Sequence, residues 1–591
     1  MIEARFDDLT PGGSSFRLVE PIGVVEAHRP DEVPPAIEAL EAVAARGLWA
    51  AGFVAYEAGP GLDPALTVRP REPKTPFARL PLVWFAMFEG REEHAPPEPP
   101  PDGPVQPAES PWRPSIDRAT YDSSIARIRE HIADGDTYQI NYTFRLRAEF
   151  QGEERDFYRD LCLAQRAAYC AYLNTGRYRV LSASPELFFR IDGPRITTRP
   201  MKGTAPRGRW PAEDEAAAGR LQASAKDRAE NAMIVDLLRN DLGRIAETGS
   251  VEVDHMFEAE RYETVWQLTS TIGARLRPGT GLAGVFRALF PSGSVTGAPK
   301  VSSTRIIAGL EDSPRGVYTG AVGWAAPHGS GGPSASFNVA IRTVVLDPEM
   351  GIAEYGTGGG ITWDSSAEGE YDEAVTKARV LTLRRPRFDL LETLRHEPER
   401  GFLRLAGHLE RLSGSARYFG FRFDPEAASR ALEKAAADLG EEVARVRLTL
   451  AKYGDVAASA TQLPPAPDGP VRLAVDDEPV DPDDVMLFHK TTHRDAYLRR
   501  ERRHPEAGEV ILVNTRGEAT ETTVANLAVR LGGRWWTPPL DSGLLPGVYR
   551  TVLLREGKLA ERPIRIEDLA AAEEVALVSS VRLWRKAALI G

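Results

Sequence analysis

The sequence predicts two modules of mixed α/β and α+β structure, and three observations lead to this fold class. The chain has 591 residues, more than one domain usually contains. Between residues 115 and 383, strand-like apolar runs alternate with amphipathic helical segments. At Pro386 a new series of strands and helices begins. We therefore expect modules at 1–384 and 388–591, joined tightly rather than by a flexible tether.

The elements follow in chain order. Residues 1–93 are expected to form a folded layer, because GLWAAGFVAYEAG and LPLVWFAMFEG have the composition of buried strands. Residues 94–114 hold nine prolines, which prevent helix and predict a solvated, extended linker. ENAMIVDLLRNDLGRIAE has apolar residues at helical spacing and is predicted as a helix. A further helix is expected from Glu370 to Arg385, ended by the proline that follows.

The composition narrows the function classes. Lys and Arg number 73 against 85 Asp and Glu, a net charge of −12 without a concentrated basic stretch, so nucleic acid is not the expected partner. Two cysteines, Cys162 and Cys170, are too few for a disulfide scaffold or a cysteine zinc cluster. The start of the chain lacks the pattern of a signal peptide, and no uncharged apolar run approaches the roughly 20 residues of a membrane span. We expect a soluble cytoplasmic enzyme.

Two residues of the first module are candidates for covalent and acid catalysis. Lys202, in RPMKGTAPR, stands between a strand end and a glycine turn, where burial would lower its pKa and expose a nucleophilic amine. Glu186, in SPELFF, precedes an apolar run that could raise its pKa and make it a general acid. The alternatives are a solvated surface lysine and an ordinary glutamate at a strand edge.

Three carboxylates and two glycine-rich segments are further candidates. Glu370 and Glu373 share one face of a predicted helix, and with Glu230 they would offer the oxygen ligands that Mg²⁺ prefers. The alternative is an exposed acidic helix face. PSGSVTGAPK and YGTGGGITWDS place flexible backbone where N–H groups can face an anion. Neither fits a nucleotide-binding fingerprint.

The second module contains the parts of a pyridoxal phosphate site. Lys490, beyond a short apolar stretch, is a candidate for a Schiff base, and Glu521 could accept a hydrogen bond from a protonated pyridine nitrogen. The turn GLLPG, ending at Gly547, is expected to open a helix that seats a phosphate, with Arg411 as a second contact. Each feature alone is also compatible with a surface charge or a plain turn.

The first module resembles the chorismate-utilising enzymes, which include anthranilate, aminodeoxychorismate and isochorismate synthases. The ordered motifs that carry the resemblance are PMKGTAPRG, SPELF, ENAMIVDLLRNDLGR, PSGSVTGAPK, FNVAIRT and GTGGGITWDS. The likeness covers residues 115–383 and implies that family's two-layered β-sandwich core with helices. Lys202 stands where anthranilate synthases have alanine, and Gln139 stands where isochorismate-forming members have lysine. The combination of Lys202 with Gln139 resembles that of the aminodeoxychorismate synthases.

This resemblance implies roles for the candidates. Lys202 would add to C2 of chorismate as the 4-hydroxyl leaves with a proton from Glu186, and ammonia would then enter at C4. The three carboxylates would hold a Mg²⁺ that clamps the ring carboxylate. The implied substrate-binding residues are Gln139, Thr296, Tyr318, Arg342, Gly358, Gly359 and Gly360. Trp266 occupies the place of a histidine found in many relatives, which puts any proton transfer by that histidine in doubt.

The second module resembles the fold-type-IV pyridoxal phosphate enzymes over nearly all of 388–591. KTTHR is similar to the form in aminodeoxychorismate lyase, and the aminotransferases carry another version. By this resemblance Lys490 carries the cofactor, Glu521 faces its ring nitrogen, and Arg411 with the backbone of Gly547 and Val548 binds its phosphate. A homodimer through this module is a further expectation.

Together the two resemblances imply that the second module consumes what the first makes, giving 4-aminobenzoate for folate synthesis and releasing pyruvate. Cys162 and Cys170 lie where a helix runs into a strand, without the strand–helix turn of a glutaminase nucleophile. Ammonia is therefore expected from a separate glutamine amidotransferase subunit. The alternatives are an enzyme with an anthranilate-type or secondary-metabolite product and a non-catalytic chorismate-binding scaffold.

Overall fold

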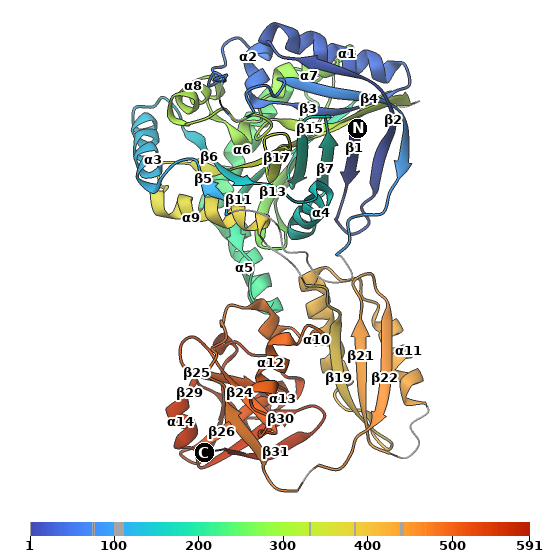
Figure 1. Cartoon of the computed structure of the whole chain (residues 1–591), viewed down its shortest axis with the longest axis vertical. Helices are drawn as coiled ribbons and strands as arrows, with labels where there is room; N and C mark the ends of the chain where they lie inside the picture. The colour runs from blue at the N-terminus through green and yellow to red at the C-terminus, as the bar shows by residue number, and fades with distance from the viewer. Residues whose placement is uncertain are drawn as a thin grey trace. The chain divides into compact units, whose positions relative to one another are not determined.

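A computed structural model describes residues 2–73, 75, 77–99, 111–329, 332–382, 386–437, 442–466 and 468–590. The chain forms two compact units (Figure 1). The first contains Met1–Pro206 and Ala218–Arg385, and the second contains Arg207–Ala217 and Pro386–Gly591. The short segment Arg207–Ala217, here called the strap, thus belongs to the second unit although its sequence lies within the first module. Residues 100–110 of the predicted linker lie outside the described residues.

Strands dominate the first unit. Within the described residues they form one hydrogen-bonded network. The strands are β1 (Glu3–Asp7), β2 (Ser15–Ala27), β3 (Trp49–Val54), β4 (Val83–Glu93), β5 (Arg113–Pro114), β6 (Gln139–Glu149), β7 (Tyr169–Asn174), β8 (Arg179–Ser184), β9 (Leu187–Asp192), β10 (Arg195–Arg199), β11 (Met201–Pro206), β12 (Glu252–Arg261), β13 (Val265–Arg275), β14 (Gly297–Ala298), β15 (Ala321–Gly329), β16 (Gly332–Val339), β17 (Thr343–Asp347) and β18 (Ile352–Ile361).

Helices complete this unit. They are α1 (Val33–Ala45), α2 (Gly59–Leu62), α3 (Arg118–Ala133), α4 (Glu154–Gln165), α6 (Ala225–Gly243), α7 (Leu282–Leu289), α8 (Lys300–Leu310) and α9 (Ala367–Ala378), and α5 (Pro211–Ala223) begins in the strap. The predicted helix around Met233 is α6, which buries Ile234, Val235, Leu238 and Leu242. The helix expected to reach Arg385 is shorter, because α9 ends at Ala378 and a 3-10 turn follows over Arg379–Leu381.

The second unit has two sheets. Within the described residues the smaller has the order β20-β19-β21-β22, and the larger has β28-β27-β26-β30-β31-β23-β24-β25-β29. Their strands are β19 (Leu390–Glu397), β20 (Gly401–Phe402), β21 (Ala444–Leu450), β22 (Val456–Gln462), β23 (Val471–Val475), β24 (Glu509–Val513), β25 (Glu518–Thr522), β26 (Asn526–Leu531), β27 (Arg534–Thr537), β28 (Ala560–Glu561), β29 (Ile564–Arg565), β30 (Glu574–Ser579) and β31 (Leu583–Leu589). The helices are α10 (Leu405–Phe419), α11 (Pro425–Ala436), α12 (Asp495–Arg503), α13 (Val548–Arg555) and α14 (Ile566–Ala570). The two predicted modules of mixed α and β structure are confirmed.

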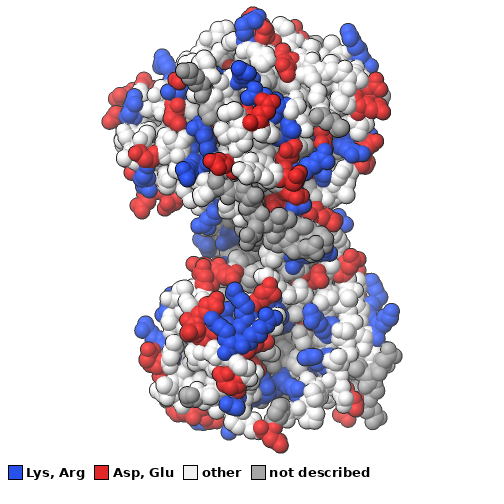
Figure 2. Space-filling view, in the orientation of Figure 1, with Lys and Arg blue, Asp and Glu red and all other residues white. Residues whose placement is uncertain are grey.

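The surface carries both signs of charge. Figure 2 shows Lys and Arg side chains intermixed with Asp and Glu on the visible face of each unit. Among the described residues no helix combines the length and apolar character needed to cross a bilayer.

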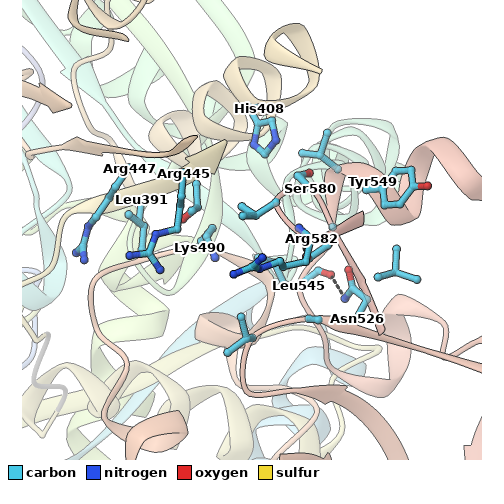
Figure 3. Close-up of a pocket in the computed structure, with 18 of the residues that line it drawn as sticks. Leu391, His408, Arg445, Arg447, Lys490, Asn526, Leu545, Tyr549, Ser580 and Arg582 are labelled. Atoms are coloured by element: carbon cyan, nitrogen blue, oxygen red, sulfur yellow. Dashed lines mark hydrogen bonds between the residues drawn. The ribbon is translucent and has the colours of Figure 1, made fainter. Parts of the chain in front are cut away.

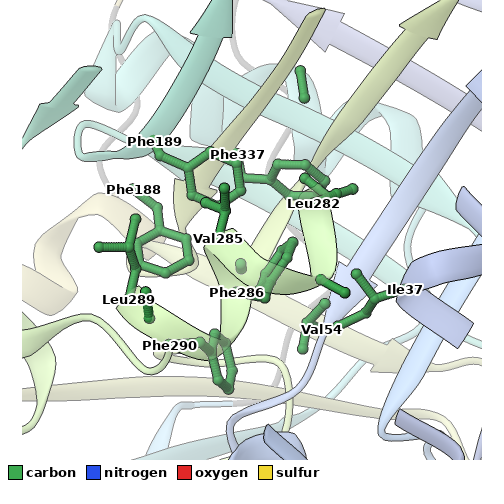
Figure 4. Close-up of a cluster of buried hydrophobic side chains, with 14 of the residues drawn as sticks. Ile37, Val54, Phe188, Phe189, Leu282, Val285, Phe286, Leu289, Phe290 and Phe337 are labelled. Carbon is green, nitrogen blue, oxygen red and sulfur yellow. The ribbon is translucent and has the colours of Figure 1, made fainter. Parts of the chain in front are cut away.

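An aromatic cluster forms the centre of the largest core of the first unit (Figure 4). The ring of Phe286, on α7, lies 5.3 Å from Phe189 and 5.2 Å from Phe337 between ring centroids. Phe188 and Phe290 each lie 6.0 Å from it. Since α7 presents this ring to strands β9 and β16, the cluster fixes the helix on the sheet.

Removing the Phe286 ring tests this core. We expect Phe286→Ala to lower the free energy of unfolding by about 3–5 kcal/mol, because a buried phenyl group leaves a cavity. Urea denaturation followed by circular dichroism measures the change. Met350→Ala is the control, since that side chain is 63% exposed and should change stability by about 0.5 kcal/mol or less. Equal small effects of the two variants would contradict the central position of Phe286 in this core.

Candidate active sites

A cavity of about 360 Å³ in the first unit brings together most of the residues predicted for the first site. The predicted residues that line it are Glu186, Lys202, Glu230, Tyr318, Arg342, Gly358, Gly360, Glu370 and Glu373. They come from β11, β18, α6, α9 and the loops around β8, β15 and β17. Segments far apart in the sequence therefore meet at one cavity.

Lys202 projects from β11, where the pairing with β13 shifts register between Met201 and Thr204. Its Nζ lies 3.4 Å from Oε2 of Glu230 on α6. Space for the ammonium comes from Gly360, because a Cβ added there would lie 2.3 Å from Lys202 Nζ. The site thus holds a partly buried amine beside a carboxylate.

Glu186 is a buried carboxyl between β8 and β9. Burial raises its pKa to about 8, although the hydrogen bond from Ser294 and the charge of Lys202 act in the opposite direction. Ser294 Oγ donates to Glu186 Oε1 at 2.5 Å. Near neutral pH this carboxyl holds a proton, as a general acid requires.

Two of the predicted metal ligands lie on α9. Burial raises the pKa of Glu370, whose Oε1 accepts from Ser365 Oγ at 2.6 Å. The ammonium of Lys377, 2.8 Å from Glu373 Oε1, lowers the pKa of Glu373 to about 2. Lys377 Nζ also donates to the carbonyl oxygen of Gly358 at 2.9 Å. Lys377 was not predicted, although its position four residues after Glu373 on the same helix was a signal in the sequence.

Carboxylate oxygens have the donor chemistry that Mg²⁺ prefers, and Glu230, Glu370 and Glu373 line one cavity. Their arrangement does not form a ligand cluster. Over the described ranges, no three acidic, histidine or cysteine side chains are close enough to share an ion. The structure pairs Glu230 with Lys202 and Glu373 with Lys377 instead.

Three predicted substrate-binding residues are not among those that line the cavity. Gln139 begins β6, and neither polar atom of its buried amide has a hydrogen-bond partner among the residues that the structure describes. Its Nε2 lies next to the space at Gly360. Thr296 is buried and donates to the carbonyl oxygen of Ser292 at 2.9 Å. A Cβ on Gly359 would lie 2.9 Å from Glu370 Oε2.

Gly356 and the glycines at 358–360 lie within strand β18 and are not the flexible backbone that the sequence suggested. It pairs with β6 in regular antiparallel register, with Gly360 opposite Asn141. A Cβ on Gly356 would meet the Tyr318 ring at 2.2 Å. These glycines therefore make room for the side chains of the site.

A buried ion pair fixes the elements around this cavity. Arg315 Nη2 donates to Glu311 Oε1 at 2.6 Å and to the carbonyl oxygen of Asn141 at 2.7 Å, and its Nη1 donates to the carbonyl oxygen of Val295 at 2.7 Å. Glu311 also accepts from the backbone nitrogen of Thr143 at 3.0 Å. Both charged side chains are almost fully buried. The pair joins the loop before Thr296 to the start of β6.

A second cavity, of about 590 Å³, lies in the second unit (Figure 3). The predicted residues Arg411, Lys490, Glu521, Gly547 and Val548 all line it. Lys490 is partly buried, and this burial, with the nearby charge of Arg411, lowers its pKa to about 8. A substantial fraction of its amine is therefore neutral near physiological pH, as a Schiff-base lysine requires.

Glu521, on β25, is held by three donors. Tyr497 Oη donates at 3.0 Å, the backbone nitrogen of Leu545 at 3.2 Å and Asn526 Nδ2 at 3.3 Å. Burial raises its pKa to about 7 in spite of these bonds. Arg494, which also lines this cavity, donates to the carbonyl oxygen of Thr523 at 2.5 Å.

Arg411, on α10, is oriented by Glu392, which the sequence analysis missed. Two guanidinium nitrogens donate to the Glu392 carboxylate at 2.8 and 2.6 Å, and a third donates to the Pro546 carbonyl oxygen at 3.1 Å. A guanidinium has five N–H donors, so two remain for an anion. Gly547 caps the N-terminus of α13, where backbone N–H groups also face an anion. This donor set fits the phosphate of pyridoxal phosphate, and Lys490 and Glu521 fit its aldehyde and ring nitrogen.

An unpredicted group of arginines also lines this cavity: Arg445, Arg447 and Arg582 (Figure 3). Arg445 and Arg447 alternate along β21 and thus share one face of the strand. Within the described part of the chain neither guanidinium has an ion-pair or hydrogen-bond partner. Burial lowers the pKa of Arg582, and the nearby charges of Arg585, Arg395 and Arg445 lower it further. Such a surplus of positive charge favours an anionic ligand. The alternation of arginine and apolar residues in ARVRL was the available signal.

Comparison with known proteins agrees with this geometry. Residues 16–383 match the family model of chorismate binding enzymes, and residues 389–590 match that of class IV amino-transferases. An aminodeoxychorismate synthase from Streptomyces griseus is 43% identical over 293 residues, which are 49% of this chain and 39% of the relative. Aminodeoxychorismate synthase component 1 from Escherichia coli is 41% identical over 273 residues, which are 46% of this chain and 59% of the relative.

The solved structure of anthranilate synthase component I from Streptococcus pneumoniae is similar, with 27% identity and a TM-score of 0.54 over 63% of this chain and 93% of that one. The chain spans 39% and 59% of the lengths of the two curated relatives. The predicted pair of folds, a chorismate-utilising fold followed by a class IV aminotransferase fold, is confirmed.

Gly360 and Gly358 offer a matched test of the first cavity. Gly360→Ala should leave the melting temperature nearly unchanged, because the added methyl group meets the flexible ends of Lys202 and Gln139. Gly358→Ala should cost about 1–3 kcal/mol of stability, because its Cβ would lie 2.1 Å from the Tyr142 carbonyl oxygen. Thermal denaturation compares the stabilities of the two variants. Peptide mapping after brief acetylation measures how readily Lys202 reacts, and this labelling should change in Gly360→Ala alone. Unaltered labelling would contradict the geometry.

Proposed function

This chain belongs to the chorismate binding enzyme family, and we propose that it converts chorismate and ammonia to 4-amino-4-deoxychorismate, then to 4-aminobenzoate and pyruvate for folate synthesis. One observation carries the proposal: each cavity holds a lysine suited to covalent chemistry. Lys202 lies beside Glu230 in a cavity that the proton-bearing Glu186 also lines. Lys490 lies in a cavity that Glu521 also lines.

In the proposed first reaction, the Lys202 amine forms a bond to C2 of chorismate while the bond from C4 to its hydroxyl breaks. Glu186 supplies the proton with which the hydroxyl leaves as water. Ammonia then forms the bond to C4 and the lysine nitrogen leaves C2, which restores the amine. Arg342 and Tyr318 are proposed to bind the carboxylate of the enolpyruvyl side chain, since both line the cavity. Glu230, Glu370 and Glu373 are the proposed ligands of Mg²⁺, which would supply positive charge for the ring carboxylate; binding of the ion would require Glu230 and Glu373 to leave their ion pairs with Lys202 and Lys377.

In the proposed second reaction, Lys490 removes the proton from C4 of aminodeoxychorismate and pyruvate is eliminated as the ring becomes aromatic. Bound pyridoxal phosphate supplies an electron sink for the charge that develops at this carbon. Glu521 would accept the hydrogen bond from the protonated pyridine nitrogen, and Arg411 with the α13 N-terminus would hold the phosphate. Aminodeoxychorismate carries two carboxylates, and we propose that Arg445, Arg447 and Arg582 bind them.

The source of ammonia is proposed to be a separate glutamine amidotransferase subunit. Cys162 and Cys170 are buried free thiols in the first unit. Burial raises the pKa of Cys162 well above its usual range, which is the opposite of an activated nucleophile. Neither cysteine therefore supports a glutaminase reaction in this chain.

Product analysis by liquid chromatography with mass detection tests the proposal. The purified protein receives chorismate, ammonium, Mg²⁺ and pyridoxal phosphate, and we expect 4-aminobenzoate and pyruvate. Lys202→Ala should abolish both products, by about 1,000-fold or more, because the covalent step is lost. Lys490→Ala should make aminodeoxychorismate accumulate. Anthranilate from the unmodified protein would contradict the first assignment, and normal 4-aminobenzoate from Lys490→Ala would contradict the second.

The pH dependence of the first reaction gives a separate test. Glu186 acts when protonated, so amination should decline as pH rises through its pKa of about 8. The Ser294 hydrogen bond favours the ionised carboxylate and holds this pKa down. Ser294→Ala should therefore move the alkaline limb of kcat/KM to higher pH. Ser302→Ala, which does not line the cavity, is the control. A limb that stays in place or moves to lower pH would contradict the role of Glu186.

A further inference from the structure

The strap is a tightly built piece of the second unit. Arg207 makes a bidentate ion pair with Asp214, with both bonds at 2.7 Å, and its guanidinium lies 4.3 Å from the centre of the Tyr418 ring. Tyr418 Oη donates to the Gly208 carbonyl oxygen at 2.7 Å. Gly208 allows the fold of the strap, because a Cβ there would lie 2.2 Å from the Asp214 backbone nitrogen. The strap is therefore an ordered element that is held at a fixed position in the second unit.

Side chains at the centre of the strap fasten it next to the lysine of the second cavity. Arg209 makes ion pairs with Asp541 at 2.7 Å and with Asp483 at 3.1 Å. The ring of Trp210 lies 5.1 Å from that of Phe488, two residues before Lys490. The strap thus packs against the chain that leads into Lys490.

His489, the residue before Lys490, makes a direct hydrogen bond to the strap. Its Nε2 lies 3.2 Å from the Arg209 carbonyl oxygen, and its Nδ1 lies 2.9 Å from Ser415 Oγ. Burial lowers the pKa of His489 to about 3, so the ring is neutral. Because a carbonyl oxygen only accepts, Nε2 carries the proton and Nδ1 accepts from Ser415. The backbone of the strap therefore fixes both the tautomer and the orientation of this ring.

A second line of contact leads to Glu521. Trp210 packs on the apolar cluster of Leu487, Phe488 and Leu512, and the Tyr497 ring packs on the same cluster. The hydroxyl of Tyr497 donates to Glu521 Oε1 at 3.0 Å. The cluster that Trp210 covers thus supports both charged groups proposed to act on the cofactor.

We propose that the strap is a positioning element of the second active site, in which the Arg209 carbonyl oxygen and the Trp210 ring hold His489 and Tyr497, and through them Lys490 and Glu521. This inference rests on the proposed lyase function. It assigns part of the second site to residues 207–217, which lie within the first module in sequence. The strand that carries Lys202 ends at Pro206, the residue before the strap.

Full-length variants test the strap. Trp210→Ala should weaken pyridoxal phosphate binding by about tenfold and shift the visible absorbance band of the bound cofactor, since Lys490 loses its support. With aminodeoxychorismate as substrate, kcat should fall by about 10- to 100-fold while KM changes by less than about threefold. Trp210→Phe should restore most of the loss. Trp536→Ala is the matched control, because the Arg534 guanidinium lies 4.7 Å from the centre of the Trp536 ring, as that of Arg209 lies 4.8 Å from the centre of the Trp210 ring. Trp536 does not line the cavity. It should bind and absorb like the unmodified protein.

Gly208→Ala provides a second variant, which disturbs the strap without removing any side chain from the cavity, and it should show the same spectral shift. If Trp210→Ala and Gly208→Ala both bind pyridoxal phosphate with the affinity and absorbance of the unmodified protein, the inference is overturned and the proposed function stands. Failure of the unmodified chain to bind pyridoxal phosphate would overturn both. Equal losses in Trp536→Ala and Trp210→Ala would show a general structural effect and would also overturn it.

Discussion

The first cavity depends on the buried ion pair between Glu311 and Arg315. Removing two charges from water is costly unless their hydrogen bonds are satisfied, and here Arg315 also donates to the carbonyl oxygens of Val295 and Asn141. These two residues belong to the glycine-containing loop and to β6, whose partner β18 makes room for Lys202. One pair of charges therefore aligns the chain segments that form the cavity. Its contribution is to specify an arrangement rather than simply to add stability.

The same cost of burial sets the chemistry of both cavities. Withdrawal from water favours the neutral form of an ionisable group, so it raises the pKa of Glu186 and Glu521 and lowers that of Lys490. A carboxyl that keeps its proton and an amine that can lose one are the forms that acid and covalent catalysis require. Glu392 differs because Arg411 and His408 outweigh its burial and hold its pKa at about 2. Local partners thus decide which buried groups react and which only orient others.

Short motifs predicted much of this structure, because a motif places chemistry and backbone conformation in the same few residues. The two modules, helix α6, and the cavities around Lys202 and Lys490 followed from such patterns. Properties that depend on distant pairing did not. The glycines at 358–360 suggested flexible backbone, because their pairing with β6 is not visible in the sequence. Arg445 and Arg447 resemble a solvated strand face until the cavity opposite them is known. The strap was missed because its partners lie more than 200 residues along the chain.

The strap also changes what counts as a module in this chain. A cut at Pro386, where the sequence suggests a clean junction, would leave the second unit without residues 207–217 and would expose the apolar surface that Trp210 covers. The excised piece would then be prone to aggregation in solution, whatever its catalytic residues. Recombination between related genes faces the same limit, since exchanging the second unit whole requires moving two separate stretches of coding sequence. Each unit is therefore built from two separate stretches of the chain.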